Sequence, residues 1–214
     1  MKLTATTFLT LDGVMQAPGG PEEDTTGGFQ HGGWVAPLFG EDDGRFIDSW
    51  FARAGAFLLG RRTFEIFAGF WPQVTDPDNE VARLLNELPK YVVSTGSPDL
   101  SWHNSEQISG DVAGRVAELK RAQGDELQVH GSGRLLGTLL EHDLVDELRL
   151  ITFPVTLGSG RRLFPDGFTK AFTLVSADTT AAGALVTTYR PAGEPRYGTA
   201  GLTEEEGVVR ETMS

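Results

Sequence analysis

The sequence predicts an α/β fold in which a mixed β-sheet carries helices on its faces. Short apolar runs, typical of strands buried on both faces, alternate with helix-like segments over most of the chain. The last strand-like segments then follow one another without an intervening helix. The length of 214 residues fits one domain with an appendage, and hydrophobic residues make up 39% of the chain, enough for a real core.

The first expected strand, residues 3–10, is uncharged and rich in β-branched threonine, and it stops at the turn-forming pair Asp12-Gly13. Residues 56–59 and 91–94 are short apolar runs of the kind found in doubly buried strands. The remaining expected strands lie at 127–130, 148–153, 172–177 and 184–189.

Apolar residues at helical spacing predict a helix over residues 42–53, where Phe46, Ile47, Trp50 and Phe51 recur. Another helix is expected after Thr63, which is a candidate cap for it. The remaining expected helices lie at 78–87, 111–123 and 135–140.

Two segments lack a periodic pattern. Residues 17–33 are loaded with Gly, Pro, Thr and acidic side chains and predict a long loop, and loops of that length in a compact domain are usually functional. After Pro191 the apolar content falls, and the acidic run Glu204-Glu205-Glu206 follows. We therefore expect residues 1–190 to form the domain and residues 191–214 to be an acidic, disordered tail.

Composition excludes several classes of function. The 30 acidic and 18 basic residues give a net charge of −12, which argues against broad binding to nucleic acid or to an anionic membrane. The absence of cysteine excludes disulfides and thiolate metal sites, and the four histidines lack metal-ligand spacing. No apolar run is long enough to span a membrane, and the alternating N-terminus is unlike a signal peptide, so we expect a cytoplasmic protein.

Glycine follows two of the buried strands and precedes an expected helix in each case. Residues 60–63 (GRRT) combine a tight turn, the free N–H groups of a helix start and two guanidiniums, which suit a phosphate; an ordinary turn with solvated arginines fits as well. Residues 131–135 (GSGRL) allow close approach to the backbone, without the spacing of the dinucleotide fingerprint. Ligands of open sheets collect beyond the strand ends, so both turns would address one dinucleotide.

In this order the segments resemble the dihydrofolate-reductase-like superfamily. The matching motifs are LDG at 11–13, LGRRTFE at 59–65, VST at 93–95, HGSG at 130–133 and LGSGRRLFP at 157–165. Over about residues 1–190 the chain is most similar to the reductase domain of bifunctional riboflavin-biosynthesis deaminase-reductases and to its stand-alone bacterial relatives. The resemblance implies a three-layer αβα architecture with a mainly parallel sheet of about eight strands. It also implies NADPH as the hydride donor and a homodimer.

The same resemblance assigns cofactor binding to the strand-end turns and to the start of the loop after the first strand. These residues are Val14, Gly60, Arg61, Arg62, Thr63, Ser94, Thr95, Gly131, Ser132, Gly133, Arg134 and Leu135. It further implies that residues 14–16 and the loop after them form a mobile lid beside the nicotinamide, which would exclude water during transfer.

Folate-reducing relatives carry a substrate-binding carboxylate on the first helix. Here Ile47 takes the matching position and Asp48 follows it, so Asp48 is a catalytic candidate, with a solvated helix-surface carboxylate as the alternative. Asp12 is a second candidate, although Asp-Gly is also an ordinary turn.

Flat heterocycles stack on aromatic rings, and the candidates for that contact are Trp34, Trp50 and Trp71. His130, at a strand end, is interpreted as structural. The expected function is NADPH-dependent hydride transfer to a C=N or C=O bond of a small, pterin- or pyrimidine-like heterocycle. The alternative is a non-catalytic nucleotide-binding or regulatory protein that retains the fold.

Overall fold

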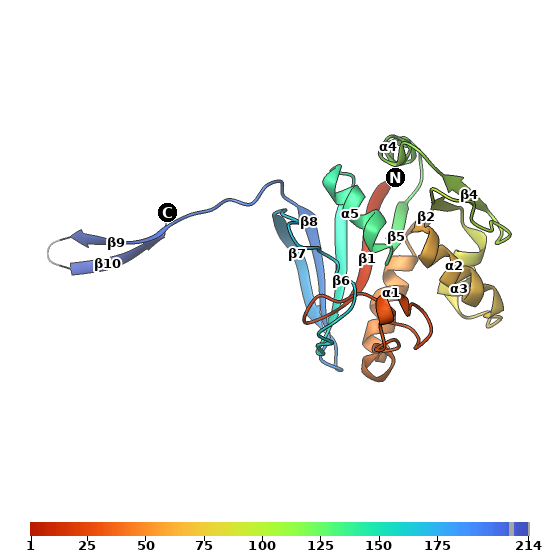
Figure 1. Cartoon of the computed structure of the whole chain (residues 1–214), viewed down its shortest axis with the longest axis horizontal. Coiled ribbons are helices and arrows are strands. Elements are labelled where there is room, and N and C mark those ends of the chain that lie inside the picture. Colours follow the sequence, from red (N-terminus) through yellow and green to blue (C-terminus); the bar gives the residue numbers. More distant parts are fainter. Residues whose placement is uncertain (206–207, 214) are drawn as a thin grey trace.

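The computed structural model describes residues 1–205 and 208–213, and eight of its strands form one sheet. Their bounds are β1 (Lys2–Thr10), β2 (Ala54–Gly60), β3 (Lys90–Val93), β4 (Ser105–Ile108), β5 (Glu126–His130), β6 (Glu147–Phe153), β7 (Phe172–Thr179) and β8 (Leu185–Pro191). The strand order is β4-β3-β2-β5-β1-β6-β8-β7 (Figure 1). Strands β4 to β6 in that order pair in parallel, whereas β8 runs antiparallel to β6 and β7 antiparallel to β8.

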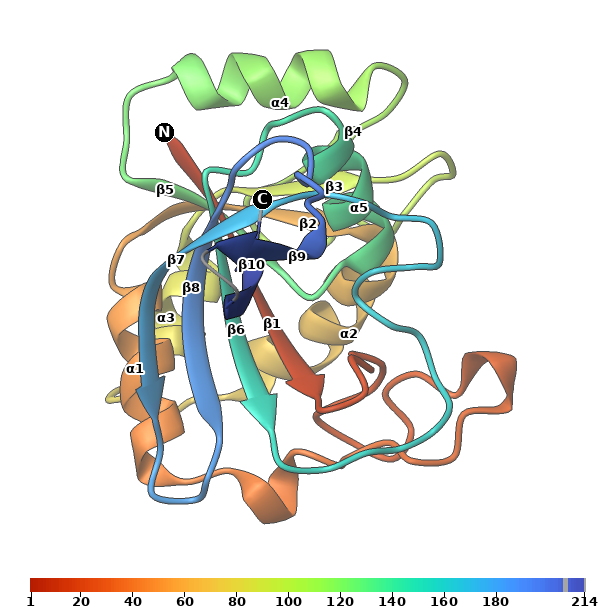
Figure 2. The same cartoon turned by 90° about the vertical axis from the view of Figure 1, so that its left-hand side faces the viewer.

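Five α-helices cover the two faces of the sheet (Figures 1 and 2). Their bounds are α1 (Glu41–Phe51), α2 (Arg61–Phe70), α3 (Glu80–Glu87), α4 (Val112–Arg121) and α5 (Gly133–Glu141). Successive side chains of β2 point to opposite faces of the sheet. Leu58 packs with apolar residues of α4 and α5, whereas Phe57 and Leu59 pack with those of α1, α2 and α3. The mixed, mainly parallel αβα architecture predicted from the sequence is confirmed.

The expected strands and helices are present, with two differences. Strand β4 was not expected, because its four residues, Ser-Glu-Gln-Ile, lack the apolar run that marks the neighbouring strands. Helix α2 begins at Arg61 after Gly60, so Thr63 lies inside the first turn and is not the cap. The Thr63 hydroxyl instead accepts a hydrogen bond from the backbone N–H of Ser132 at 3.2 Å.

The segment after residue 190 is the one for which composition predicts an acidic, disordered tail. An antiparallel hairpin of β9 (Ala200–Glu205) and β10 (Val208–Met213) stands away from the sheet at the end of an extended segment (Figure 1). Apolar and β-branched residues, among them Val208 and Val209, recur between its charges and favour strand pairing. Glu206, part of the acidic run, lies outside the described residues.

Across the described parts of the chain, none of the helices combines the length and apolar character of a membrane span.

Candidate functional site

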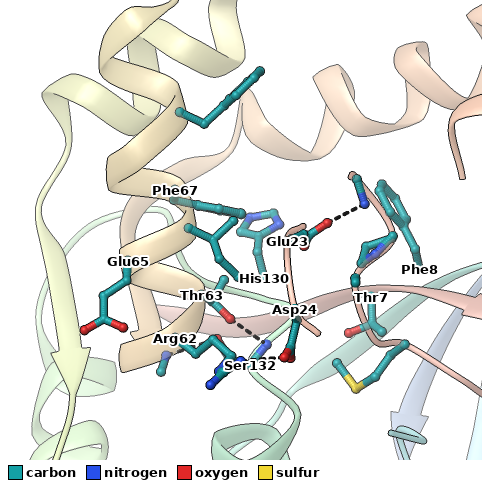
Figure 3. Close-up of a pocket in the computed structure, with 18 of the residues that line it drawn as sticks. Thr7, Phe8, Glu23, Asp24, Arg62, Thr63, Glu65, Phe67, His130 and Ser132 are labelled. Atoms are coloured by element: carbon teal, nitrogen blue, oxygen red, sulfur yellow. Dashed lines mark hydrogen bonds and ion pairs between the residues drawn. The ribbon is translucent and has the colours of Figure 1, made fainter. Parts of the chain in front are cut away.

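A cavity of about 1780 Å³ opens beyond the carboxyl ends of β1, β2, β3 and β5. Its walls come from these strand ends, from α1 and the starts of α2 and α5, and from the long loop after β1 (Figure 3). Ligands of open α/β sheets bind at this rim, because the strand-to-helix turns converge there. The topology therefore gathers segments far apart in the sequence around one space.

The two glycine-containing turns predicted as phosphate sites lie side by side. Strands β2 and β5 are neighbours, so their ends meet at the rim. The backbone N–H of Gly60 donates to the hydroxyl of Ser132 at 3.0 Å, and Ser132 in turn donates its backbone N–H to Thr63. Gly131 has a φ of +55°, the left-handed region that glycine tolerates best. The starts of α2 and α5 thus point their free N–H groups towards a common region.

The end of β3 extends the same rim. Ser94 and Thr95 line the cavity, and the Ser94 hydroxyl accepts the backbone N–H of Gly96 at 3.1 Å. Arg61 reaches this turn, since a Cβ added at Gly96 would lie 3.0 Å from its Nη1 atom. Arg61 also forms an exposed ion pair with Glu65, at 2.7 Å. Its guanidinium is therefore held at the border between the α2 turn and the β3 turn.

Arg62, the next residue, faces a different partner. It forms an ion pair with the buried carboxylate of Asp24, which also receives Arg161 from the loop after β6. Burial opposes ionisation of Asp24, but hydrogen bonds from Thr26 and the charges of the two guanidiniums outweigh it and lower the pKa. We call Asp24, Arg62 and Arg161 the clasp. It ties the loop after β1 to α2 and to the loop after β6.

Gln16 fastens the same loop from within. Its amide nitrogen donates to the backbone oxygens of Asp24 and Thr26 at 3.0 and 2.9 Å, and its Oε1 accepts the N–H of Arg161 at 2.9 Å. The Trp34 indole N–H donates to the backbone oxygen of Gln16 at 2.8 Å. Residues 17–33, here called the lid loop, are therefore ordered against the rim, with Asp24 lining the cavity.

The inner end of the cavity is more apolar. Phe8, Ile47, Phe51 and Phe67 line it together with His130 (Figure 3). The His130 ring stacks on Phe51 with ring centres 4.4 Å apart. Burial, and then the positive charge of Arg149, lower the pKa of His130 to about 3, so the ring is neutral near pH 7. This end suits a flat, uncharged ring system.

Most of the residues that the resemblance assigned to the cofactor line this cavity. They are Gly60, Arg61, Arg62, Thr63, Ser94, Thr95, Gly131, Ser132, Gly133, Arg134 and Leu135. Asp48 and Trp71, the candidates for catalysis and stacking, line it as well.

Four predicted residues lie elsewhere, each for a packing reason. The Asp12 carboxylate accepts hydrogen bonds from the Thr10 hydroxyl at 2.6 Å and from the backbone N–H of Gly158 at 2.8 Å, so it joins the end of β1 to the loop after β6. Val14 and Trp34 are buried in the apolar cluster on the α1 face. Trp50 belongs to that cluster, with Arg149 above its ring.

Sequence reasoning missed other residues of the wall. Thr7, Phe8 and Phe51 face the cavity from the interior of predicted elements, where period and burial predict only core packing. Asp24 and Arg161 are far apart in the sequence, so no local pattern predicts their ion pair. Arg161 does stand in a motif that carried the family resemblance. His130 had a usable signal, because it is the last strand residue before a ligand-binding type of turn.

The wall fits the phosphates of a dinucleotide. Arg61, Arg62, Arg134 and Arg161 line it, within a protein of net charge −12. A Cβ added at Gly133 would lie 2.7 Å from the Met15 sulfur, so a larger residue there would require the Met15 side chain to shift. Guanidiniums, hydroxyls and helix-start N–H groups are the donors that phosphates require.

Comparison with known protein families shows to which family the chain belongs. The model of the RibD C-terminal domain matches residues 1–186. The chain belongs to the RibD C-terminal domain family. The chain has the dihydrofolate-reductase-like α/β fold.

Relatives of this RibD C-terminal domain include two uncharacterised proteins of Bacillus subtilis. YyaP is 32% identical over 111 residues, which span 51% of this chain and 58% of YyaP. YwjB is 28% identical over 133 residues, covering 61% of this chain and 70% of YwjB.

Solved structures agree on the fold. A putative riboflavin biosynthesis protein from Shewanella sp. PV-4 has a TM-score of 0.67 at 22% identity, with 90% of this chain and 99% of that one covered. Dihydrofolate reductase from Enterococcus faecalis, in complex with NADP(H), has a TM-score of 0.55 at 17% identity over 89% and 96% of the two chains. At these identities the likeness establishes the fold.

Proposed function

We propose that this protein is an NADPH-dependent reductase acting on a C=N or C=O bond of a small pterin- or pyrimidine-like heterocycle. The observation that carries the proposal is the pair of hydrogen-bonded turns at the ends of β2 and β5, with arginines on both sides. Membership of a family of reductase domains supports it. NADPH, when bound, supplies a hydride to the substrate carbon while a proton reaches the heteroatom.

The residues of the rim would hold the cofactor by its phosphates. The N–H groups at the starts of α2 and α5, together with Thr63, would donate hydrogen bonds to the phosphates. Arg61, beside Ser94 and Thr95, would distinguish NADPH from NADH through the 2′-phosphate. The lid loop would exclude water from the reacting carbon.

The inner end would orient the heterocycle. Phe8, Phe51 and Phe67 provide apolar surface for its faces. Asp48 is the α1 carboxylate that lines the cavity, and we propose it as the proton donor, directly or through a water. His130 is unsuited to that role, because a pKa of about 3 leaves the ring uncharged near neutral pH, and a neutral imidazole is too weak an acid.

A non-catalytic nucleotide-binding protein is the second candidate. Ile47 lines the cavity at the α1 position where folate-reducing relatives carry a carboxylate. The missing carboxylate would reduce turnover more than binding of the nucleotide.

Two measurements separate these functions. Titration of the purified protein with NADPH and NADH, followed by fluorescence, tests binding. Oxidation of NADPH is then followed over dihydrofolate, dihydropterins and ribosylaminopyrimidines, with Asp48→Asn as the comparison. Turnover that falls at least tenfold in Asp48→Asn, with unchanged NADPH binding, supports the reductase. Binding without turnover supports the alternative, and no binding at millimolar NADPH contradicts both.

A further inference from the structure

A buried chain of hydrogen bonds runs through the sheet and ends at the inner wall of the cavity. Arg149 of β6 donates to both oxygens of Glu126 on β5, at 2.8 and 2.7 Å. Glu126 also accepts the amide of Gln128 at 2.9 Å, and Gln128 Oε1 lies 3.1 Å from His130 Nε2. The relative exposure of the four side chains is 7% or less. Such a fully paired interior network holds its last member in one orientation.

The chain fixes the amide orientation of Gln128. Its Nε2 carries two hydrogens, and the partners are the Glu126 carboxylate and the backbone oxygen of Trp50, the latter at 2.6 Å. A backbone carbonyl cannot donate. Burial opposes the ionisation of Glu126, but the bonds and charge of Arg149 outweigh it and lower its pKa, so this carboxylate also only accepts. Hence Oε1 of Gln128 must face the His130 ring.

The orientation of Gln128 in turn fixes the tautomer of His130. An amide oxygen only accepts, so His130 Nε2 carries the single proton of the neutral ring. Nδ1 is then left with a lone pair. Among residues 1–205 and 208–213 no protein group donates a hydrogen bond to Nδ1, while Phe51 covers one face of the ring. Figure 3 shows the ring between Phe67 of α2 and Glu23 of the lid loop, inside the cavity.

We propose that His130 determines substrate specificity by accepting, at Nδ1, a hydrogen bond from a ring N–H or amino group of the heterocycle. Gln128, Glu126 and Arg149 are positioning residues, which hold the ring in the accepting tautomer. The inference rests on the proposed function in one respect, that the heterocycle occupies the inner end of the cavity. It selects heterocycles with an N–H edge over those in which alkyl groups cover that edge.

A matched pair of probes tests this contact. Lumazine (pteridine-2,4-dione) carries ring N–H groups, and 1,3-dimethyllumazine has the same ring system without them. Dissociation constants of both are measured for the wild-type protein, His130→Leu and His130→Gln, with NADPH binding measured separately in each. One neutral hydrogen bond predicts that the wild-type preference for lumazine is about tenfold larger than that of His130→Leu. Glutamine can donate to Gln128 and keep a free oxygen, so His130→Gln should restore part of the preference.

The outcomes separate this inference from the function on which it rests. An equal preference in wild type and His130→Leu, or no lumazine binding by a protein that binds NADPH, overturns the role of His130 alone. If the wild-type protein did not bind NADPH at all, the proposed function itself would be contradicted. Nitrogen-15 NMR of the ring at pH 7 checks the tautomer directly without any ligand. A proton on Nε2 is expected, and a proton on Nδ1 would overturn the inference.

Discussion

Arg61 and Arg62 are neighbours in the chain but have different partners. Arg61 pairs with exposed Glu65 beside the β3 turn, whereas Arg62 belongs to the clasp around Asp24. Arg61→Ala should therefore weaken NADPH about 10- to 100-fold and NADH much less, because a charge-assisted bond to the 2′-phosphate is lost. Arg62→Ala should weaken both nucleotides to a similar degree. Fluorescence titrations of the two variants check this, and equal losses in Arg61→Ala would contradict the assignment.

Thr7 carries a buried hydroxyl with no hydrogen-bond partner within the described structure, and it lines the cavity. An unsatisfied buried hydroxyl is costly, and valine removes it while keeping the shape of the side chain. Thr7→Val should therefore lower the free energy of unfolding by less than about 1 kcal/mol or increase it. If a bound ligand satisfies the hydroxyl, the same variant should bind NADPH or substrate roughly tenfold more weakly. Urea unfolding and ligand titration measure the two effects. A large loss of stability would show that the hydroxyl has a structural partner.

His130 also predicts a dependence of stability on pH. Its pKa is lowered from 6.5 to about 3, mainly by burial, so between these values the unfolded chain binds one more proton than the folded chain. Stability should then fall as the pH drops below 6.5, by up to about 1.4 kcal/mol per unit. Carboxylates with lowered pKa, such as Asp24 and Glu126, lose their contribution only at more acidic pH.

Urea unfolding of the wild type and His130→Leu at pH 7, 6 and 5 isolates this contribution, since other groups cancel in the difference. The wild type should lose stability faster over this range. Parallel curves would mean that the ring takes up its proton as readily in the folded protein as in the unfolded chain.

At this scale the sequence predicted the residues that stand in turns and missed those that stand inside elements. Gly60 and Gly131 were recognisable because glycine after an apolar run has few uses other than a tight turn. Phe51 and Thr7 have the pattern of core residues, and only the rim geometry exposes them to the cavity. The position of Asp12 outside the cavity was not predictable, because two of its partners lie in the loop after β6, 145 and 146 positions away.

The lid loop is the element whose behaviour depends most on a few charges. Asp24 is buried while Arg62 and Arg161 reach solvent, so Asp24→Asn should cost about 1–3 kcal/mol of stability and release the loop. In the wild type, added salt should screen the clasp and speed NADPH dissociation; in Asp24→Asn, dissociation should already be fast and should not respond to salt. A glutamate-specific protease should also cleave the variant faster after Glu22 or Glu23.

Glu118→Gln is the matched control, because it neutralises one carboxylate of an exposed ion pair on α4. It should leave dissociation and cleavage unchanged. If Asp24→Asn behaves like this control, the clasp does not hold the loop closed.

Elements with a strong periodic pattern were predictable, and those defined by pairing alone were not. The doubly buried strand β2 was recognised because its apolar run admits few alternatives. Strand β4 is a polar edge strand that exists because β3 offers it hydrogen bonds, which no local pattern records. Helix α2 starts three residues before the expected position, because its N-cap is Gly60, and the Thr63 hydroxyl bonds across to Ser132 instead of capping the helix.

For the whole molecule, the free edge of the sheet predicts self-association. Strand β7 ends the strand order, and Leu174 and Val175 on it are 53% and 44% exposed. An unpaired edge with apolar side chains pairs readily with a second copy around a twofold axis. We expect a homodimer by light scattering at micromolar concentration, and a monomer for Leu174→Glu combined with Val175→Lys. A wild-type monomer, or a dimeric variant, would contradict this edge as the interface.

The alternation of strands and helices was enough to predict a mixed sheet with helices on its faces, because few other arrangements bury them. The mainly parallel sheet of about eight strands was implied by the family resemblance. Charge was less informative, since a net −12 conceals the four arginines that the fold gathers at one rim. The same wall also carries eight carboxylates, so the arginines act as local contacts within an acidic surface.

The turns at the ends of β2 and β5 are expected to hold one dinucleotide between them, and a crystal structure of the protein with NADPH would show this. We expect cofactor phosphates within hydrogen-bond distance of the N–H groups that begin both α2 and α5, with the nicotinamide directed towards Phe8 and His130. NADPH bound outside this rim, or touching only one of the two turns, would contradict it.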